Sequence, residues 1–80
     1  MEFTRYYLEQ VLRKRPYLRQ EWCESVLSHP LKTRAQPDGR IQRWGFIAAE
    51  CKYLRVVTLD DGVTIHNAFF DRDFEPDTQS

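Results

Sequence analysis

Basic and amide side chains interrupt the apolar, aromatic segments between residues 40 and 74. They include Arg40, Arg43, Arg55, His66, Asn67 and Arg72. Guanidinium groups bind phosphate through paired hydrogen bonds and keep their charge, and histidine can transfer a proton near neutral pH. RNA carries its own nucleophile, the 2′-hydroxyl, so a cleaving protein needs only charge stabilisation, orientation and an acid or base. These residue types therefore indicate a candidate RNA-phosphate site.

Each candidate residue has a role in this hypothesis. We assign catalysis to Arg55 and His66, and RNA-phosphate binding to Arg43, Arg72 and Asn67. Arg40 is the alternative to Arg43, because residues three apart on a strand point to opposite faces and only one of them can join the site. The competing interpretation is structural. In it, Arg55 pairs with an acidic residue on the sheet surface, and His66 is a half-buried hydrogen-bonding residue.

The elements that would position these residues follow from hydrophobic spacing and turn signals. Apolar residues at helical spacing predict helices over 3–14 and 19–29, which Pro16 and Pro30 end. Strand-forming residues between turn signals predict strands over 32–36, 40–47, 53–60 and 63–70. The expected fold is α+β, with two N-terminal helices followed by a four-strand antiparallel meander. The helices should cover one face of the sheet and leave the other at least partly open.

The turn between the last two strands has two possible registers. A two-residue loop at Asp61-Gly62 would place Arg55 opposite Ala68, whereas a bulged loop from Asp60 to Gly62 would place it opposite Asn67. A one-residue slip exchanges the two faces of a strand, so the registers bury different side chains. In both registers Arg55 gains a polar neighbour from the His66-Asn67 pair.

Length and charge limit the function classes. Eighty residues form one domain, which we expect over 1–74, followed by a flexible acidic tail at 75–80. The formal net charge is zero, which argues against simple polyelectrolyte binding to nucleic acid. The charges are unevenly distributed, because residues 73–80 carry three acidic and no basic side chains. The rest of the chain is therefore mildly basic.

Cofactors and membranes are not indicated by the sequence. The two cysteines, Cys23 and Cys51, lie in apolar patterns and are expected to be reduced and buried. Neither the cysteines nor the histidines have metal-ligand spacing, and there is no phosphate-binding glycine loop, so we expect no metal and no cofactor. No apolar segment approaches the ~20 residues that cross a membrane. We expect a cytoplasmic protein.

Four segments carry a family resemblance. They are R-P-Y-L-R-Q-E-W-C-E-S-V-L-S-H-P, R-I-Q-R-W-G, Y-L-R-V-V-T-L and T-I-H-N-A-F, within residues 15–72. Their order resembles that of small bacterial domains of unknown function, distant relatives of the RelE, ParE and BrnT toxins of toxin–antitoxin pairs. The resemblance implies a RelE-like fold, cleavage of mRNA, often on the ribosome, and an antitoxin partner. A ParE-like action would instead inhibit gyrase by binding.

Two function classes follow from these observations. The first is a toxin-like endoribonuclease, an mRNA interferase that uses basic residues on an open sheet face and is neutralised by an antitoxin. The second is a non-catalytic module that binds a protein, or a second copy of itself, through a sheet face or edge strand. Exposure of Tyr53, Phe69 and Phe70 near one hairpin end would favour the second class.

Overall fold

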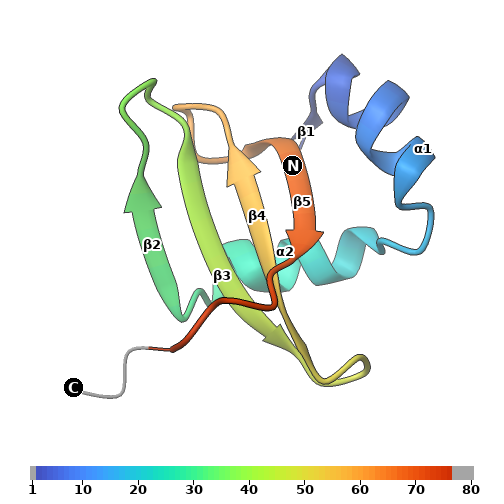
Figure 1. Ribbon diagram of the computed structural model, residues 1–80. Helices are drawn as coiled ribbons and strands as arrows, with labels where there is room; N and C mark the ends of the chain where they lie inside the picture. The colour runs from blue at the N-terminus through green and yellow to red at the C-terminus, as the bar shows by residue number, and fades with distance from the viewer. Residues whose placement is uncertain (1, 77–80) are drawn as a thin grey trace.

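The computed structural model describes residues 2–76. Its elements, in chain order, are β1 (Glu2–Phe3), the π-helix η1 (Tyr7–Val11), α1 (Leu12–Lys14), α2 (Gln20–Ser28), β2 (Lys32–Ala35), β3 (Ile41–Ile47), β4 (Lys52–Thr58) and β5 (Thr64–Phe70). The strands form one sheet in the order β1-β5-β4-β3-β2. Figure 1 shows α2 lying behind this sheet.

The predicted arrangement of the fold was wrong, although the structure is α+β. The sheet has five strands and is mixed, because β1 pairs with β5 in parallel while the other neighbours are antiparallel. The first predicted helix is reduced to η1 and the three-residue α1, whereas the short helix α2 lies within the predicted range 19–29. The four-strand antiparallel meander with a RelE-like layout is therefore replaced by a five-strand mixed sheet. The strands β2–β5 themselves lie within two residues of the predicted ranges.

Thr4 explains why the predicted helix at 3–14 begins differently. Its backbone N–H donates to the carbonyl of Ile65 (2.9 Å), which draws the chain before it into the sheet. Its side-chain Oγ1 accepts a hydrogen bond from the N–H of Tyr7 (3.1 Å), in the manner of an N-cap. Thr4 thus separates strand from helix. The spacing of Phe3 and Tyr7 predicted one continuous helix. Side-chain spacing carries no information about the hydrogen bond between the Thr4 backbone and distant Ile65, which keeps the residues before Thr4 out of the helix.

The hairpin between β4 and β5 follows neither predicted register in full. Thr58 pairs with Ile65, as the two-residue loop would require, but an irregularity beside Val57 inserts His66 as an extra residue. Val57 consequently pairs with Asn67, and Arg55 pairs with Phe69 rather than with Ala68 or Asn67. The loop is also longer than two residues, because the backbone N–H of Leu59 donates to the carbonyl of Thr64 (2.9 Å) and so closes the hairpin. Within the loop, Asp61 Oδ1 accepts from the backbone N–H groups of Val63 and Thr64 (2.9 Å each).

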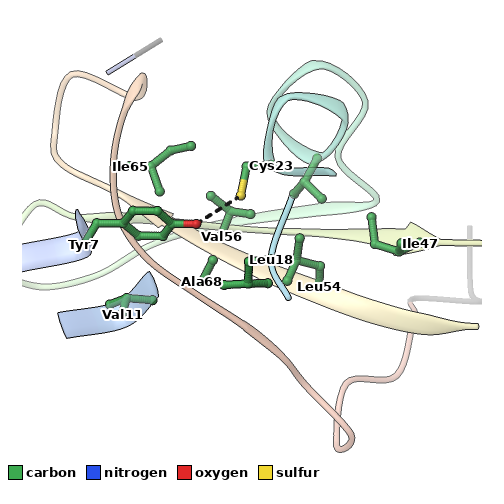
Figure 2. Packing of buried hydrophobic residues seen from close by; sticks show 10 residues of the cluster. Tyr7, Val11, Leu18, Cys23, Ile47, Leu54, Val56, Ile65 and Ala68 are labelled. Atoms are coloured by element: carbon green, nitrogen blue, oxygen red, sulfur yellow. Dashed lines mark hydrogen bonds between the residues drawn. The ribbon is translucent and has the colours of Figure 1, made fainter. Parts of the chain in front are cut away.

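The core lies between the helices and one face of the sheet (Figure 2). It consists of Tyr7, Val11, Leu18, Cys23, Val26, Ile47, Leu54, Val56, Ile65 and Ala68. The hydroxyl of Tyr7 lies 3.8 Å from Cys23 Sγ. Burial raises the pKa of both groups, so both are protonated at neutral pH. The expectation of two buried cysteines was wrong for Cys51, which is exposed at a positive φ of 52° after β3.

Gly45 sets how closely α2 approaches the sheet. A Cβ atom added at Gly45 would lie 2.9 Å from Val26 Cγ2 and 3.3 Å from Val26 Cα. The helix therefore contacts β3 at a position that only glycine leaves open. Gly45 and its partner Leu54 face α2, so the adjacent residues Trp44 and Arg55 point to the other side of the sheet. We call that other side the outer face.

The chain crosses the outer face after β5. In Figure 1 the red segment leaves β5 and passes in front of β4 and β3, on the side opposite α2. We call residues 71–76 the C-terminal segment. Of the tail predicted at 75–80, the structure describes Glu75 and Pro76, and residues 77–80 lie outside the described part. Within residues 2–76, no helix is long and apolar enough to span a membrane.

Candidate functional site

Arg55 occupies the centre of the outer face. It lies in the middle of β4, directly opposite Trp44 on β3 and Phe69 on β5. Its guanidinium carbon is 5.3 Å from the centre of the Trp44 ring system and 4.6 Å from that of Phe69. A cation over aromatic faces is held by the ring electrons. The pairing of β3, β4 and β5 therefore places the guanidinium of Arg55 between the rings of Trp44 and Phe69.

The same guanidinium binds a carboxylate of the C-terminal segment. Arg55 Nη2 and Nε donate to Asp71 Oδ2 at 2.7 and 3.3 Å, and Trp44 Nε1 donates to the same oxygen at 3.0 Å. The side chains of Arg55 and Asp71 are 27% and 11% exposed, so the pair is largely shielded from water. Burial would raise the pKa of Asp71, but the hydrogen bonds from Trp44 and Arg55 outweigh it and lower that pKa. The carboxylate is therefore ionised at neutral pH.

Aromatic rings surround this ion pair. Phe74 stacks on Trp44 with ring centres 5.2 Å apart and an angle of 11° between the ring planes. Tyr53 meets Phe74 edge-on at 5.1 Å and Phe46 at 5.3 Å. Trp44 is only 5% exposed although it points away from the helices. Its burial is therefore explained by the C-terminal segment, which covers it from outside.

Two cavities flank the C-terminal segment, and Asp71 and Phe74 line both. The larger, of about 710 Å³, has basic side chains from Arg15, Lys52 and Arg72 beside the rings of Tyr17, Tyr53, Phe69 and Phe70. The smaller, of about 310 Å³, is lined by Lys32, Arg34, Trp44, Arg55, Asp73 and Glu75. Basic side chains thus lie on both sides of the segment, and acidic side chains of the segment lie among them.

His66 lies in a separate environment at the bulge of β5. Its Nδ1 is 3.1 Å from Thr4 Oγ1, and its ring stacks on Tyr6 at 4.8 Å with 24° between the planes. Burial and the positive charge of Arg40 lower the pKa of His66, and Asp38 opposes that shift. The imidazole is consequently neutral at neutral pH, the form that accepts a proton.

The structure does not bring the assigned residues into one constellation. Arg55 is opposite Phe69, three residues along β5 from His66, so about 10 Å of strand separates the two positions. Their partners also differ. Arg55 contacts Asp71, Trp44 and Phe69, whereas His66 contacts Thr4 and Tyr6. This geometry matches the structural interpretation, in which Arg55 pairs with an acid and His66 forms a hydrogen bond.

The three predicted phosphate-binding residues lie at different places. Arg43 pairs with the core residue Val56, and its Nη1 donates to the carbonyl of Gly62 (3.0 Å), so it belongs to the helix-covered side. Asn67 pairs with Val57, and its Oδ1 accepts from the N–H of Ala68 (2.9 Å). Arg72 is exposed in the turn after β5 and lines the larger cavity. Asn67 and Arg72 therefore lie on the same side of the sheet as Arg55, because Val57 and Arg55 are two residues apart on β4, whereas Arg43 lies on the opposite side.

The most informative residues of the site were not among those assigned from the sequence. Asp71 and Phe74 come after the last predicted strand, which ends at residue 70. A usable signal was nevertheless present, since a phenylalanine between two acids at Asp73-Phe74-Glu75 is unusual in a solvated tail. Within residues 2–76, no three His, Cys, Asp or Glu side chains gather closely enough to hold a metal ion.

Comparisons with known proteins find no match for this chain among family models, curated proteins or solved structures. The site is therefore interpreted from its own geometry.

Proposed function

We propose that this protein binds single-stranded RNA on its outer face and acts there as a toxin-like endoribonuclease. The observation that best supports RNA binding is the guanidinium of Arg55, which lies between the rings of Trp44 and Phe69 and already holds an oxyanion. A phosphate oxygen makes the same charge-assisted hydrogen bonds as the Asp71 carboxylate does. Arg55 is therefore the proposed phosphate-binding group.

The aromatic rings favour a single strand over a duplex. Unpaired bases stack on aromatic side chains, and each such stack contributes about 1–3 kcal/mol, whereas the bases of a duplex are already stacked. Six basic side chains line the two cavities around Arg55, including Arg55 itself: Arg15, Lys32, Arg34, Lys52, Arg55 and Arg72. The zero net charge of the chain makes long-range attraction weak, so binding depends on these local contacts.

Cleavage is the catalytic part of the proposal. His66 is neutral at neutral pH and lies on β5, the strand that also carries Phe69 of the outer face. In the proposed reaction His66 accepts the proton of a 2′-hydroxyl as that oxygen attacks the adjacent phosphorus. The new bond closes a 2′,3′-cyclic phosphate, the bond from phosphorus to the 5′-oxygen breaks, and that oxygen leaves with a proton from water, while Arg55 binds a neighbouring phosphate of the same strand. The bound strand would have to extend from Arg55 along β5 to His66, because the two side chains share no partner.

A non-catalytic protein-binding function is the second candidate, and the β2 edge favours it. All four residues of β2 are exposed, and within the described residues β2 pairs only with β3. An antitoxin, or a second copy of the chain, could add a strand there. In the toxin-like function the antitoxin would cover β2 or the outer face, the RNA would be mRNA, free or on the ribosome, and the protein would be cytoplasmic.

RNA binding is tested by fluorescence anisotropy with a labelled short single-stranded RNA and its duplex. We expect the wild-type protein to prefer the single strand, and Arg55→Ala to weaken binding by about tenfold or more, because a charge-assisted contact is lost. The slope of log K against log salt should fall by about 0.7 for the lost phosphate contact. Arg13→Ala is the matched control, since Arg13 is exposed on α1. Equal binding by both variants would refute the assignment.

Cleavage is tested by induced expression in bacteria, with growth and total RNA followed together. We expect growth arrest with RNA decay for the wild type, and loss of both effects in a folded Arg55→Ala/His66→Gln variant. Normal growth with intact RNA at good soluble expression would leave the protein-binding candidate. Pull-down of a partner that Lys32→Pro on β2 abolishes would then support that candidate, because proline cannot take part in strand pairing.

A further inference from the structure

The C-terminal segment resembles a nucleotide in the groups that it presents to the outer face. Asp71 puts a carboxylate on Arg55 and Trp44 Nε1, where a phosphate oxygen would bind. Phe74 stacks its ring almost parallel on Trp44 at 5.2 Å, where a base would stack. The Asp71 carboxylate and the Phe74 ring therefore occupy the surface assigned to RNA. A short piece of backbone joins them, as the sugar joins the phosphate and base of a nucleotide.

Further acidic residues of the segment lie among basic residues of the sheet. Asp73 and Glu75 line the smaller cavity together with Lys32 and Arg34 of β2. An RNA strand would present its phosphates to the same two basic side chains. The segment thus matches the charge of the surface as well as its aromatic character.

The attachment of the segment depends on few contacts. The backbone N–H of Asp71 donates to the carbonyl of Tyr53 (2.9 Å), which extends the pairing of β5 by one residue. Among the described residues, the backbone of 72–76 makes no hydrogen bond to a strand, and Phe74 N–H bonds within the segment to the carbonyl of Asp71 (3.4 Å). Side chains therefore hold the segment, chiefly Asp71 and Phe74. Such a segment can open locally without unfolding the sheet.

We propose that the C-terminal segment is a built-in competitor that closes the outer face until an RNA strand displaces it. In the closed form Asp71 and Phe74 cover Arg55 and Trp44. In the open form the two cavities on either side of the segment join into one groove that runs from Lys32 and Arg34, past Arg55, to Arg15 and Lys52. This inference rests on the proposed RNA-binding function.

The expected effect follows from competition. A ligand that binds only the open form has its affinity reduced by the fraction of molecules that are open. Removing the Phe74 ring takes away the free energy of one aromatic stack from the closed form, so the open fraction should rise. We therefore expect Phe74→Ala to bind the short single-stranded RNA about 3- to 10-fold more tightly than the wild type does. Phe74→Tyr keeps the stack and should bind like the wild type.

A second variant keeps the test valid if Phe74→Ala fails to fold. Asp73→Asn/Glu75→Gln changes two exposed side chains and leaves the aromatic stack intact. It should also bind RNA more tightly, because the segment then competes less well for Lys32 and Arg34. The indole N–H resonance of Trp44, which bonds Asp71 in the closed form, should shift when RNA is added to the wild type.

Two outcomes separate this inference from the function on which it rests. If the wild type binds RNA in an Arg55-dependent way, but Phe74→Ala and Asp73→Asn/Glu75→Gln bind equally or more weakly, the competitor is refuted and the RNA-binding function remains. If no folded variant binds RNA, the proposed function fails and the inference fails with it. Tighter binding by either variant, with no change for Phe74→Tyr, supports the competitor.

Discussion

Arg55 and Asp71 form a largely shielded ion pair in which Nη2 and Oδ2 are 2.7 Å apart. The arginine stands in the middle of a strand, and the aspartate begins the segment that crosses that strand. The pair therefore joins the sheet to the chain that follows it. It also satisfies a charge that would otherwise lie between two aromatic rings without a counter-ion.

Asp71 should make the stability of the protein sensitive to acid. Its pKa is lower in the folded protein than its ordinary value of 3.8, so the unfolded chain binds the proton more readily. The contribution of the carboxylate to stability is present above that ordinary value and is lost as the pH falls through the lower, folded pKa. Asp71→Asn should lower the free energy of unfolding at neutral pH by about 1 kcal/mol and reduce the acid-dependent loss.

Urea unfolding, followed by tryptophan fluorescence at neutral and acidic pH, measures this effect. Asp73→Asn is the control, because Asp73 is exposed and its side chain should contribute little. Identical acid dependence in Asp71→Asn and Asp73→Asn would contradict the role given to the ion pair.

His66 should add a second pH dependence at higher pH. Burial first, and then the charge of Arg40, lower its pKa below the ordinary value of 6.5. The unfolded chain therefore binds the proton more readily, and stability falls as the pH decreases from 6.5 through the folded pKa. His66→Gln should flatten the stability curve in this window. An NMR titration in which the His66 pKa is 6.5 or higher would disprove this prediction.

Thr4 should stabilise the fold through its side chain as well as its backbone. Its Oγ1 accepts from the N–H of Tyr7 and lies 3.1 Å from His66 Nδ1. Thr4→Ala should cost about 1 kcal/mol of unfolding free energy, the usual effect of losing an N-cap. Thr33→Ala on the exposed strand β2 is the matched control, and we expect a smaller cost there. Thermal unfolding of both variants compares them, and equal costs would exclude a capping role.

Gly45 should tolerate no side chain while Val26 is present. A methyl group at Gly45 would meet Val26 Cγ2 at 2.9 Å and Val26 Cα at 3.3 Å, and overpacking of this kind costs about 1–3 kcal/mol. Val26→Ala removes the nearer contact but not the backbone one. A double-mutant cycle should therefore show that Gly45→Ala costs less in the Val26→Ala background than in the wild type. If the costs of Gly45→Ala and Val26→Ala in unfolding free energy simply add in the double variant, the close contact between the two residues is not what makes Gly45→Ala costly.

Local patterns predicted those parts of the fold that depend on neighbouring residues. The range of α2 follows from its apolar stripe between Pro16 and Pro30, and β2–β5 follow from turn residues such as Asp38-Gly39 and Asp61-Gly62. The two-residue strand β1 is too short to show a period, and its partner β5 is distant in the sequence. The bulge at His66 is likewise set by the pairing of strands and not by the residues beside it.

The site was harder to predict than the fold. Arg55 was assigned to catalysis because an arginine is unusual in the middle of an apolar strand, but the competing interpretation, in which it pairs with an acid, is the one that agrees with the structure. The sequence did not indicate which acid, because Asp71 reaches Arg55 only after the chain turns across the sheet. The burial of Trp44 likewise depends on Phe74, which covers it on the face opposite the helices. Long-range folding of the chain over its own sheet explains both differences.

The pairing of β1 with β5 also has a consequence for how the molecule is made. On the ribosome the chain emerges from its N-terminal end, and Phe3 must pair with Ile65, while Thr4 contacts His66 across a sequence separation of 62 residues. The first strand therefore has no partner until β5 has been synthesised. Completion of this sheet edge is a late event, and contacts of such long range are slow to form. A nascent chain halted before β5 would expose the apolar side of η1 that carries Tyr7 and Val11, which makes this stage the one most open to chaperones or aggregation.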